Sequence, residues 1–121
     1  MTNVEAVTKA IGTHGNWKSR LASAIETGKC TVTVATARAD CECEFGKWLI
    51  SLPAADAADP EVKQAKTLHT RFHQEAGKVL DLAFHGKKDE AQKSMAMGGP
   101  YAQASANLTS HMMGWRKKLG A

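Results

Sequence analysis

The chain has 121 residues, with 16 Lys and Arg against 12 Asp and Glu and a formal net charge of +4 at pH 7. This length is typical of one domain, here residues 1–121, and is enough to bury a core without metals or disulfides. Scattered basic residues predict a solvated surface and no nucleic-acid partner, and the lack of a secretory leader or an apolar stretch of about 18 residues predicts a cytoplasmic protein with no membrane contact.

The first predicted element is a long helix from Val4 to Thr27. Its apolar residues recur at steps of three and four, and Gly28 is a typical stop signal. These residues form one apolar stripe along the helix, in which the position after His14 is either Trp17 or Lys18. The one polar residue that interrupts the stripe is His14. Two glycines, Gly12 and Gly15, flank this histidine, a placement that would allow a neighbouring backbone to approach closely.

The middle of the chain gives weaker signals. Residues 29–39 alternate polar and β-branched positions, a pattern that fits either an extended connection or a further helix. Asp40 is a plausible N-cap for a short helix that carries Cys43 at about its third position and ends at Pro53. Residues 53–59 are predicted to have little regular structure.

The clearest helix begins at Asp59–Pro60, an N-cap followed by proline in the first turn, and closes at His85–Gly86. A short helix over residues 89–97 and a last helix starting at Gly98-Gly99-Pro100 complete the chain. Three long amphipathic helices and a shorter one predict an all-α fold, an antiparallel four-helix bundle with an additional short helix.

Four side chains form a candidate metal site. His69 and His73 are four residues apart on one helical face, a spacing that suits chelation of one ion but is as common in packed boundary residues. His14 favours the metal, because an unpaired polar ring in a second apolar seam would be costly. Cys43 lies where a helix N-terminus favours thiolate, and one thiolate with three imidazoles suits tetrahedral Zn²⁺.

The residues around Cys43 are interpreted as packing residues. Phe45, Trp48 and Leu49 would fix the orientation of the cysteine helix through ordinary core contacts. Gly46 and Gly77 would either let a facing helix come close or merely tolerate flexibility.

The stretch CEFGKWL, residues 43–49, closely resembles the motif Cys-x-(Leu/Phe)-Gly-x-Trp-(Leu/Ile) of the chemoreceptor zinc-binding (CZB) domain. This family occurs in bacterial cytoplasmic chemoreceptors, in some diguanylate cyclases and as free-standing small proteins. HGNWKSRL at 14–21 and HTRFHQEAG at 69–77 also resemble family segments. The family's ligand order, one histidine, the motif cysteine and a His-x-x-x-His pair, falls here on His14, Cys43, His69 and His73.

The resemblance implies a zinc-binding bundle, commonly a homodimer, that relays zinc occupancy to a bacterial signalling partner or an attached output domain. The outputs in the family are chemotaxis and cyclic di-GMP synthesis. It also implies a redox input, because oxidation of Cys43 by oxidants such as hypochlorite would weaken coordination. Cys30 and Cys41 lie outside the four-ligand pattern, and Cys41 could compete for the metal, form a disulfide with a partner, or only cap or pack.

Two other function classes remain open from the residues. A bundle metalloenzyme, with zinc or non-haem iron, is disfavoured because four protein ligands close a zinc site and because the chain lacks His-Glu-x-x-His and paired Glu-x-x-His motifs. The chain is therefore predicted not to be an enzyme. A metal-free interaction module would use the histidines in a buried hydrogen-bond network. His85 and His111 are expected to stay out of the site.

Overall fold

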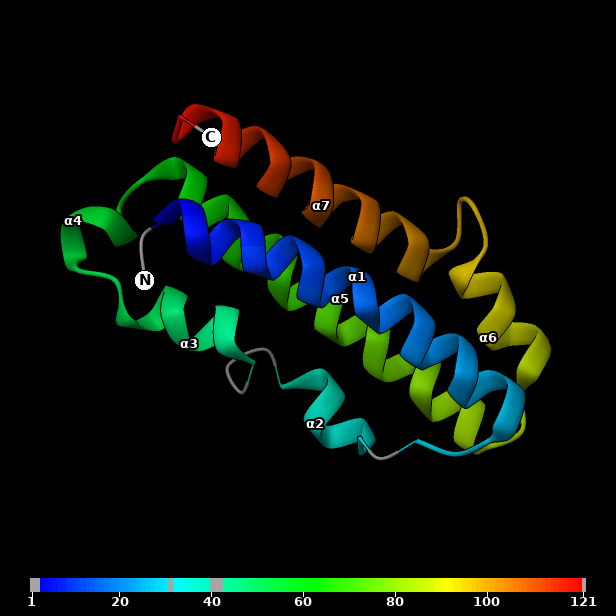
Figure 1. The fold of residues 1–121 in the computed structure, drawn as a ribbon. Coiled ribbons are helices and arrows are strands. Elements are labelled where there is room, and N and C mark those ends of the chain that lie inside the picture. Colours follow the sequence, from blue (N-terminus) through cyan, green and yellow to red (C-terminus); the bar gives the residue numbers. More distant parts are fainter. Residues whose placement is uncertain (1–2, 31, 40–42, 121) are drawn as a thin grey trace.

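The computed structural model describes residues 3–30, 32–39 and 43–120, and regular structure in these ranges is entirely helical (Figure 1). The long helices are α1 (Asn3–Thr27), α5 (Pro60–Phe84) and α7 (Pro100–Lys118). The short helices are α2 (Val34–Arg38), α3 (Glu44–Ser51), α4 (Ala54–Ala57) and α6 (Lys88–Met95). The predicted all-α class is confirmed.

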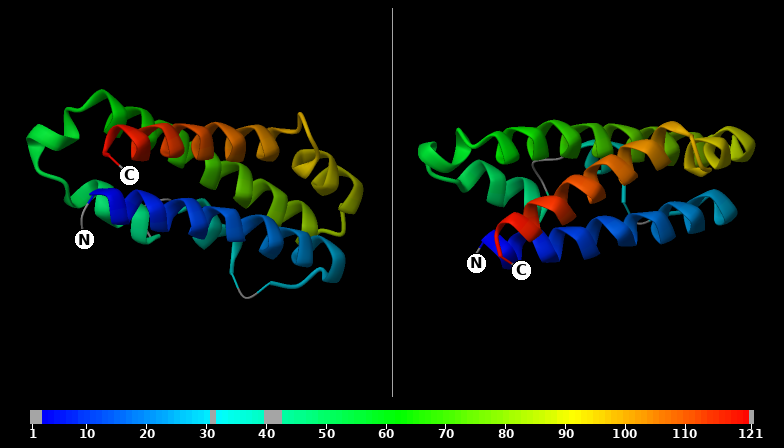
Figure 2. Two further views of the ribbon diagram at one scale, coloured as in Figure 1. Left: turned by 45° about the horizontal axis from the view of Figure 1, so that its top comes forward. Right: turned by 90° about the horizontal axis from the view of Figure 1, so that it is seen from above.

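Helix α5 is the centre of the bundle and contacts every other helix. Figures 1 and 2 show α1 and α5 running in the same direction and α7 in the opposite one, with the start of α1 and the end of α7 at the same end of the molecule. The chain returns from the end of α1 to the start of α5 through α2, α3 and α4. This return path is divided into three short helices in the described residues, whereas the sequence predicted one short helix before Pro53 and left residues 29–39 undecided between an extended connection and a helix.

The core lies where the apolar stripes of α1, α5 and α7 meet. The fully buried side chains include Leu21 from α1, Phe72 and Leu80 from α5, and Leu108 and Met112 from α7. Each such side chain contributes about 1.5–3 kcal/mol when it leaves water. The stripes predicted from the period of the sequence are therefore the faces that pack together.

The ends of the long helices follow the predicted signals. The Asp59 Oδ1 atom accepts a hydrogen bond from the Glu61 N–H at 2.9 Å, as an N-cap does, and Pro60 occupies the first turn. Gly28 and Gly86 end α1 and α5 with φ of 73° and 71°, a conformation that residues with a Cβ seldom adopt. These local signals set the span of the two helices that carry the histidines.

Three local predictions were wrong. Cys43 is the N-cap of α3 and not a residue of its third position, because its Sγ atom accepts the Gly46 N–H at 3.4 Å and begins the helix there. Residues 54–57 form α4 and not an irregular segment, since alanines following Pro53 favour a helical turn. A Cβ added at Gly12 or Gly15 would meet no atom within 4 Å, so no backbone approaches α1 there.

The other predictions for the middle segment differ in outcome. Residues 29–39, for which the pattern left two possibilities, contain α2. The predicted cap Asp40 and the cysteine Cys41 lie outside the described residues. Helix α6 occupies nearly the predicted range.

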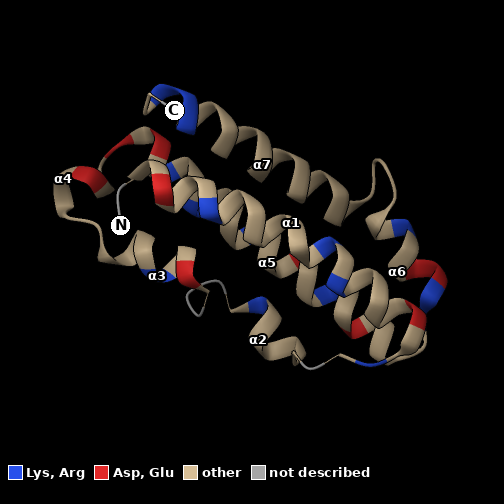
Figure 3. Cartoon of the chain, viewed as in Figure 1, with Lys and Arg blue, Asp and Glu red and all other residues tan. Residues whose placement is uncertain are grey.

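Charged residues are dispersed over the helices, and the basic group at 116–118 marks the end of α7 (Figure 3). Both basic and acidic residues occur along α1 and α5, and the basic ones do not form one continuous stripe in this view. None of the helices in the described ranges combines the length and the apolar character that crossing a membrane requires.

Candidate metal site

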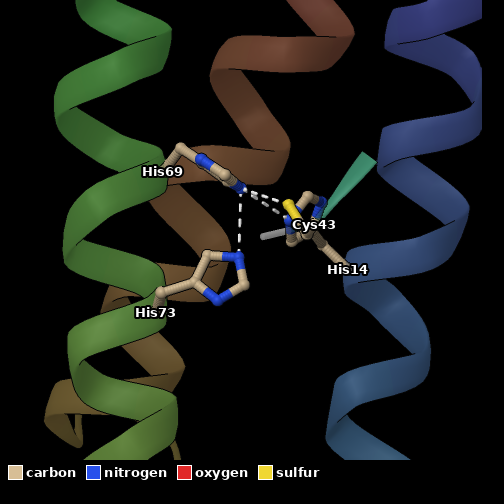
Figure 4. A group of neighbouring side chains, drawn as sticks. All are labelled: His14, Cys43, His69 and His73. Atoms are coloured by element: carbon tan, nitrogen blue, oxygen red, sulfur yellow. Dashed lines mark hydrogen bonds between the residues drawn. The ribbon is translucent and has the colours of Figure 1, made fainter. Parts of the chain in front are cut away.

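The four predicted ligands converge from three helices on one point inside the bundle (Figure 4). His14 comes from the middle of α1, His69 and His73 come from the middle of α5, and Cys43 comes from the N-cap of α3. The three histidines are 1–2% exposed, and Cys43 is partly buried. The histidines interrupt the apolar stripes of α1 and α5 because their side chains face one another across the two helices.

The His69 ring lies at the centre of the cluster. Its Nε2 atom is 3.1 Å from Nε2 of His14, 3.0 Å from Nε2 of His73 and 3.2 Å from Sγ of Cys43. One ligand atom from each of the four residues lies within 4.8 Å of all the others. Within the described residues, this is the group of His, Cys, Asp and Glu side chains that could hold a metal ion.

Backbone carbonyls set the tautomers of two rings. The His14 Nδ1–H donates to the Ala10 carbonyl at 2.8 Å, and the His73 Nδ1–H donates to the Ala37 carbonyl at 2.9 Å. A carbonyl can only accept, so both Nδ1 atoms carry the hydrogen and both Nε2 atoms present a lone pair to the centre. This is how a metal-ligating histidine is usually held.

The donor set fits zinc. Zinc–nitrogen bonds of about 2.0–2.1 Å at tetrahedral angles separate two nitrogen ligands by about 3.3 Å. The observed Nε2–Nε2 distances of 3.0 and 3.1 Å are close to that value. A single hydrogen on the His69 Nε2 could not be donated fully to three neighbours at once, whereas all four atoms can bind one cation. Three imidazoles and a thiolate are ligands that zinc accepts.

Burial keeps the imidazoles neutral. Removal from water lowers the pKa of His14 to about 4; the hydrogen bond to the Ala10 carbonyl opposes this shift, and the neighbouring His73 ring adds to it. The pKa of His69 is also lowered well below its usual value, first by burial and then by the neighbouring His73 and His14 rings. A neutral imidazole is the form that binds a metal, so both rings are ready to bind at neutral pH.

Aromatic rings pack around the histidines of the site. The Phe45 ring meets the rings of His14 and His69 edge to face, with centroids 5.9 and 5.1 Å apart. The Phe72 ring lies 5.0 Å from that of His14, and the Trp17 ring lies 6.1 Å from that of His73. Trp48 stacks on Phe45, and the remaining packing residues, Gly46 and Leu49, are buried on the same helix.

The carbonyls of Ala10 and Ala37 are the functional groups that the sequence did not predict. Ala10 is four residues before His14 on one helix, a spacing that could have suggested the bond. No sequence signal connects Ala37 with His73, because a backbone atom carries no residue type. The two remaining histidines lie elsewhere: His85 bonds the Asp81 carbonyl and His111 the Glu61 carbonyl.

A partly open cavity of about 250 Å³ leads to the cluster between α1 and α3. Its walls are mostly apolar and include His14, Cys43, Phe45 and Trp48, and its outer part includes the exposed Lys9 and Lys47. Lys9 also bridges to Glu44 at 2.7 Å and thereby joins the two helices at the rim. Cys43 is thus both a candidate ligand and part of the cavity wall.

The fold and the cluster together define an all-α bundle with a buried site of three histidines and one cysteine. The family model of the chemoreceptor zinc-binding domain matches residues 14–80, more than half of the chain and a range that contains all four residues. The chain therefore belongs to the chemoreceptor zinc-binding domain family, and it is a zinc-binding signalling domain. Searches of curated proteins and of solved structures gave no significant match.

Proposed function

We propose that the chain is a zinc sensor of bacterial signalling that binds one Zn²⁺ through His14, Cys43, His69 and His73. The observation that carries this proposal is the convergence of four ligand atoms from three helices within 4.8 Å. The family match supports zinc as the ion. We further propose that the chain acts as one domain and is not an enzyme.

We propose that the geometry of the site turns zinc binding into a signal. Zinc supplies a centre of positive charge that all four atoms can share. His14 and His73 offer their lone pairs because carbonyls hold their Nδ1 hydrogens, and Cys43 sits at a helix N-terminus that favours thiolate. Because α1, α3 and α5 each contribute a ligand, binding free energy is used to hold the three helices together. Occupancy then shifts the bundle between two packings.

The output is proposed to be chemotaxis or cyclic di-GMP synthesis, through a separate signalling protein or an attached output domain. A homodimer is proposed as the working unit. Two large apolar side chains, Ile50 of α3 and Met113 of α7, are 68% and 50% exposed and are available for such contacts. Light scattering of the purified chain tests this proposal, since a monomer at all concentrations would contradict it.

Metal analysis of the protein purified without chelator or affinity metal tests the zinc proposal. We expect about one zinc per chain in the parent and a large loss in Cys43→Ala. Cys30→Ala is the matched control, because Cys30 is also a partly buried cysteine but lies outside the cluster, and it should keep its zinc. A parent without zinc, or with another metal in its place, would contradict the proposal.

A redox input through Cys43 is proposed as the second function of the same site. Hypochlorous acid would transfer its oxygen to the thiolate, which forms sulfenic acid while chloride leaves, and the oxidised sulfur binds zinc less well. The cavity that reaches Cys43 gives the oxidant access. We expect one-equivalent oxidant to release zinc from the parent and from Cys30→Ala alike. Unchanged zinc affinity and helix content after oxidation would show that this input does not exist.

The enzyme alternative receives no support from the cluster. The four residues that could hold a metal include no carboxylate, and four protein ligands would leave a zinc ion no open position for a reacting water. A metal-free hydrogen-bond network remains distinguishable by titration with a chelator. Such a network would keep its stability when the metal is removed, whereas the zinc site would lose it.

A further inference from the structure

Helix α2 packs directly on the part of α5 that carries the candidate ligands. Ala37 is fully buried at this contact, and its carbonyl accepts the hydrogen bond from His73 Nδ1 at 2.9 Å. Val34, one turn earlier on α2, also packs against the core. The site therefore touches a helix that supplies no ligand of its own.

A glycine on α5 makes this close contact possible. Gly77 is one turn beyond His73, and a Cβ added there would overlap the Cγ atom of Arg38. Arg38 follows Ala37 on α2, so the two contacts fix neighbouring residues of α2 on neighbouring turns of α5. No larger residue at 77 would leave the Arg38 side chain where it is.

Helix α2 depends on these contacts for its existence. It has five residues, and helices shorter than about 12 residues are only marginally stable on their own in water. The Thr33 side chain caps it by accepting the Thr36 N–H at 3.1 Å. An element of this kind belongs to the least stable part of a fold and can leave or join it without global unfolding.

We propose that α2 is a positioning element of the metal site, and that docking of α2 on α5 and zinc binding strengthen each other. This inference rests on the proposed role of His73 as a ligand. The Ala37 carbonyl holds the His73 ring in the tautomer that points Nε2 to the centre. Linkage then requires that zinc favours docked α2 by the same factor by which docked α2 favours zinc. The fraction of molecules in which helix α2 is docked on α5 therefore rises when zinc is bound.

Two substitutions on α2 test the proposal against a matched control. Ala37→Val adds two methyl groups at a fully buried position and should displace α2 from α5. Ala35→Val makes the same change at an exposed position of the same helix, with the same loss of helix propensity. We expect zinc affinity about 10–100-fold weaker in Ala37→Val, the usual effect of losing a partner behind a ligand, and little changed in Ala35→Val.

Hydrogen exchange on the unaltered chain gives a second readout that does not depend on a variant folding. The amides of Ala37 and Ala39 bond the carbonyls of Thr33 and Thr36 within α2. We expect zinc to slow their exchange about tenfold or more, the counterpart of the affinity change under linkage. The amides in the middle of α7, a helix that carries no ligand, exchange through global unfolding and show how much of any slowing comes from the higher stability of the whole domain.

The outcomes separate this inference from the proposed function. If His73→Ala binds zinc as tightly as the parent, His73 is not a ligand and both proposals fail. If His73→Ala loses zinc but Ala37→Val binds as tightly as Ala35→Val, only the role of α2 is overturned. If Ala37→Val does not fold, exchange in the parent decides: protection of α2 by zinc supports the proposal, and equal exchange with and without zinc overturns it.

Discussion

The His69 imidazole favours metal binding but destabilises the folded protein when no metal is bound. Its Nε2 atom has three polar neighbours at 3.0–3.2 Å, and the ring is 1% exposed. Burying a polar ring costs free energy unless its partners compensate, and here they compensate fully only around a shared cation. The residue is therefore suited to the metal-bound protein and is costly in the metal-free one.

Replacing this ring by an apolar one should separate the two effects. We expect His69→Leu to bind zinc at least about 100-fold more weakly, and to make the metal-free protein as stable as the parent or more stable by about 1 kcal/mol. Urea unfolding in the presence of a chelator and zinc titration measure the two quantities. The exposed His85 provides the control His85→Leu, which should leave zinc binding unchanged.

Tyr101, which is not one of the candidate ligands, makes a pH-dependent contribution to the free energy of unfolding. Burial raises the pKa of its hydroxyl to about 12, and the neighbouring Ser105 hydroxyl partly offsets this increase. Within the described residues, the Tyr101 hydroxyl is buried and makes no hydrogen bond that meets the usual distance and angle limits. A raised pKa means that the folded state holds its proton more tightly than the unfolded one, whose pKa is about 10. The contribution of the protonated hydroxyl to the free energy of unfolding is thus complete below pH 10 and is lost as the pH rises from 10 to about 12.

We expect stability to fall by roughly 2 kcal/mol from this group as the pH rises through that window. Tyr101→Phe should be as stable as the parent at neutral pH and should lack this part of the alkaline loss. Urea unfolding of both proteins across the window gives the difference. The chain has one tyrosine, so absorbance of tyrosinate follows its ionisation directly. An ionisation midpoint near pH 10 in the folded protein would show that burial does not act on the hydroxyl.

At the scale of single residues, the sequence predicted those parts of the site that interrupt a pattern. His14, His69 and His73 stood out because a polar ring in an apolar stripe needs a partner. The Ala37 carbonyl could not be predicted, since every residue has one and its role depends on where α2 docks. The wrong place given to Cys43 has a similar cause: its sulfur replaces the Asp or Ser usual at an N-cap.

At the scale of the helices, the strong local signals were reliable and the weak ones were not. Helices α1, α5 and α7 have long apolar stripes and glycine or proline at their ends, which fixed their spans. Helix α2 has five residues, and tertiary contacts with Ala37 decide its structure. Residues 54–57 form a helical turn whose alanines have high helix propensity, but a segment of four residues is too short for propensity to decide its structure.

The glycines of the helices give a test of how closely α2 approaches α5. Gly114 lies in α7 with open space around it, so Gly114→Ala should stabilise the fold by about 0.5–1 kcal/mol through lower backbone entropy in the unfolded chain. Gly77→Ala has the same effect on the unfolded chain, but its new methyl group displaces the Arg38 side chain. Overpacking of this kind lowers the free energy of unfolding by about 1–3 kcal/mol. We expect Gly77→Ala to be the less stable variant by chemical denaturation, and equal stability would mean that Arg38 moves aside freely.

At the scale of the whole molecule, the site joins segments that are distant in the chain. Ligands come from α1, from the start of α3 and from α5, and α5 contacts every other helix. Contacts between such distant segments are entropically costly to form, so an ion that bridges them acts on the entire bundle. The topology thus makes zinc a ligand of the folded state as a whole.

Zinc should therefore raise the midpoint of a single thermal transition. At free zinc 100-fold above the dissociation constant, binding to the folded state alone adds about 2.7 kcal/mol. For a domain of this size that free energy corresponds to an increase in Tm of roughly 10 °C. Calorimetry with zinc and with a chelator measures the shift, and His69→Leu should show a shift of at most about 2 °C under the same conditions. A parent that melts in two separate steps, of which zinc moves only one, would show that the ligated helices and the rest of the chain do not unfold as one domain.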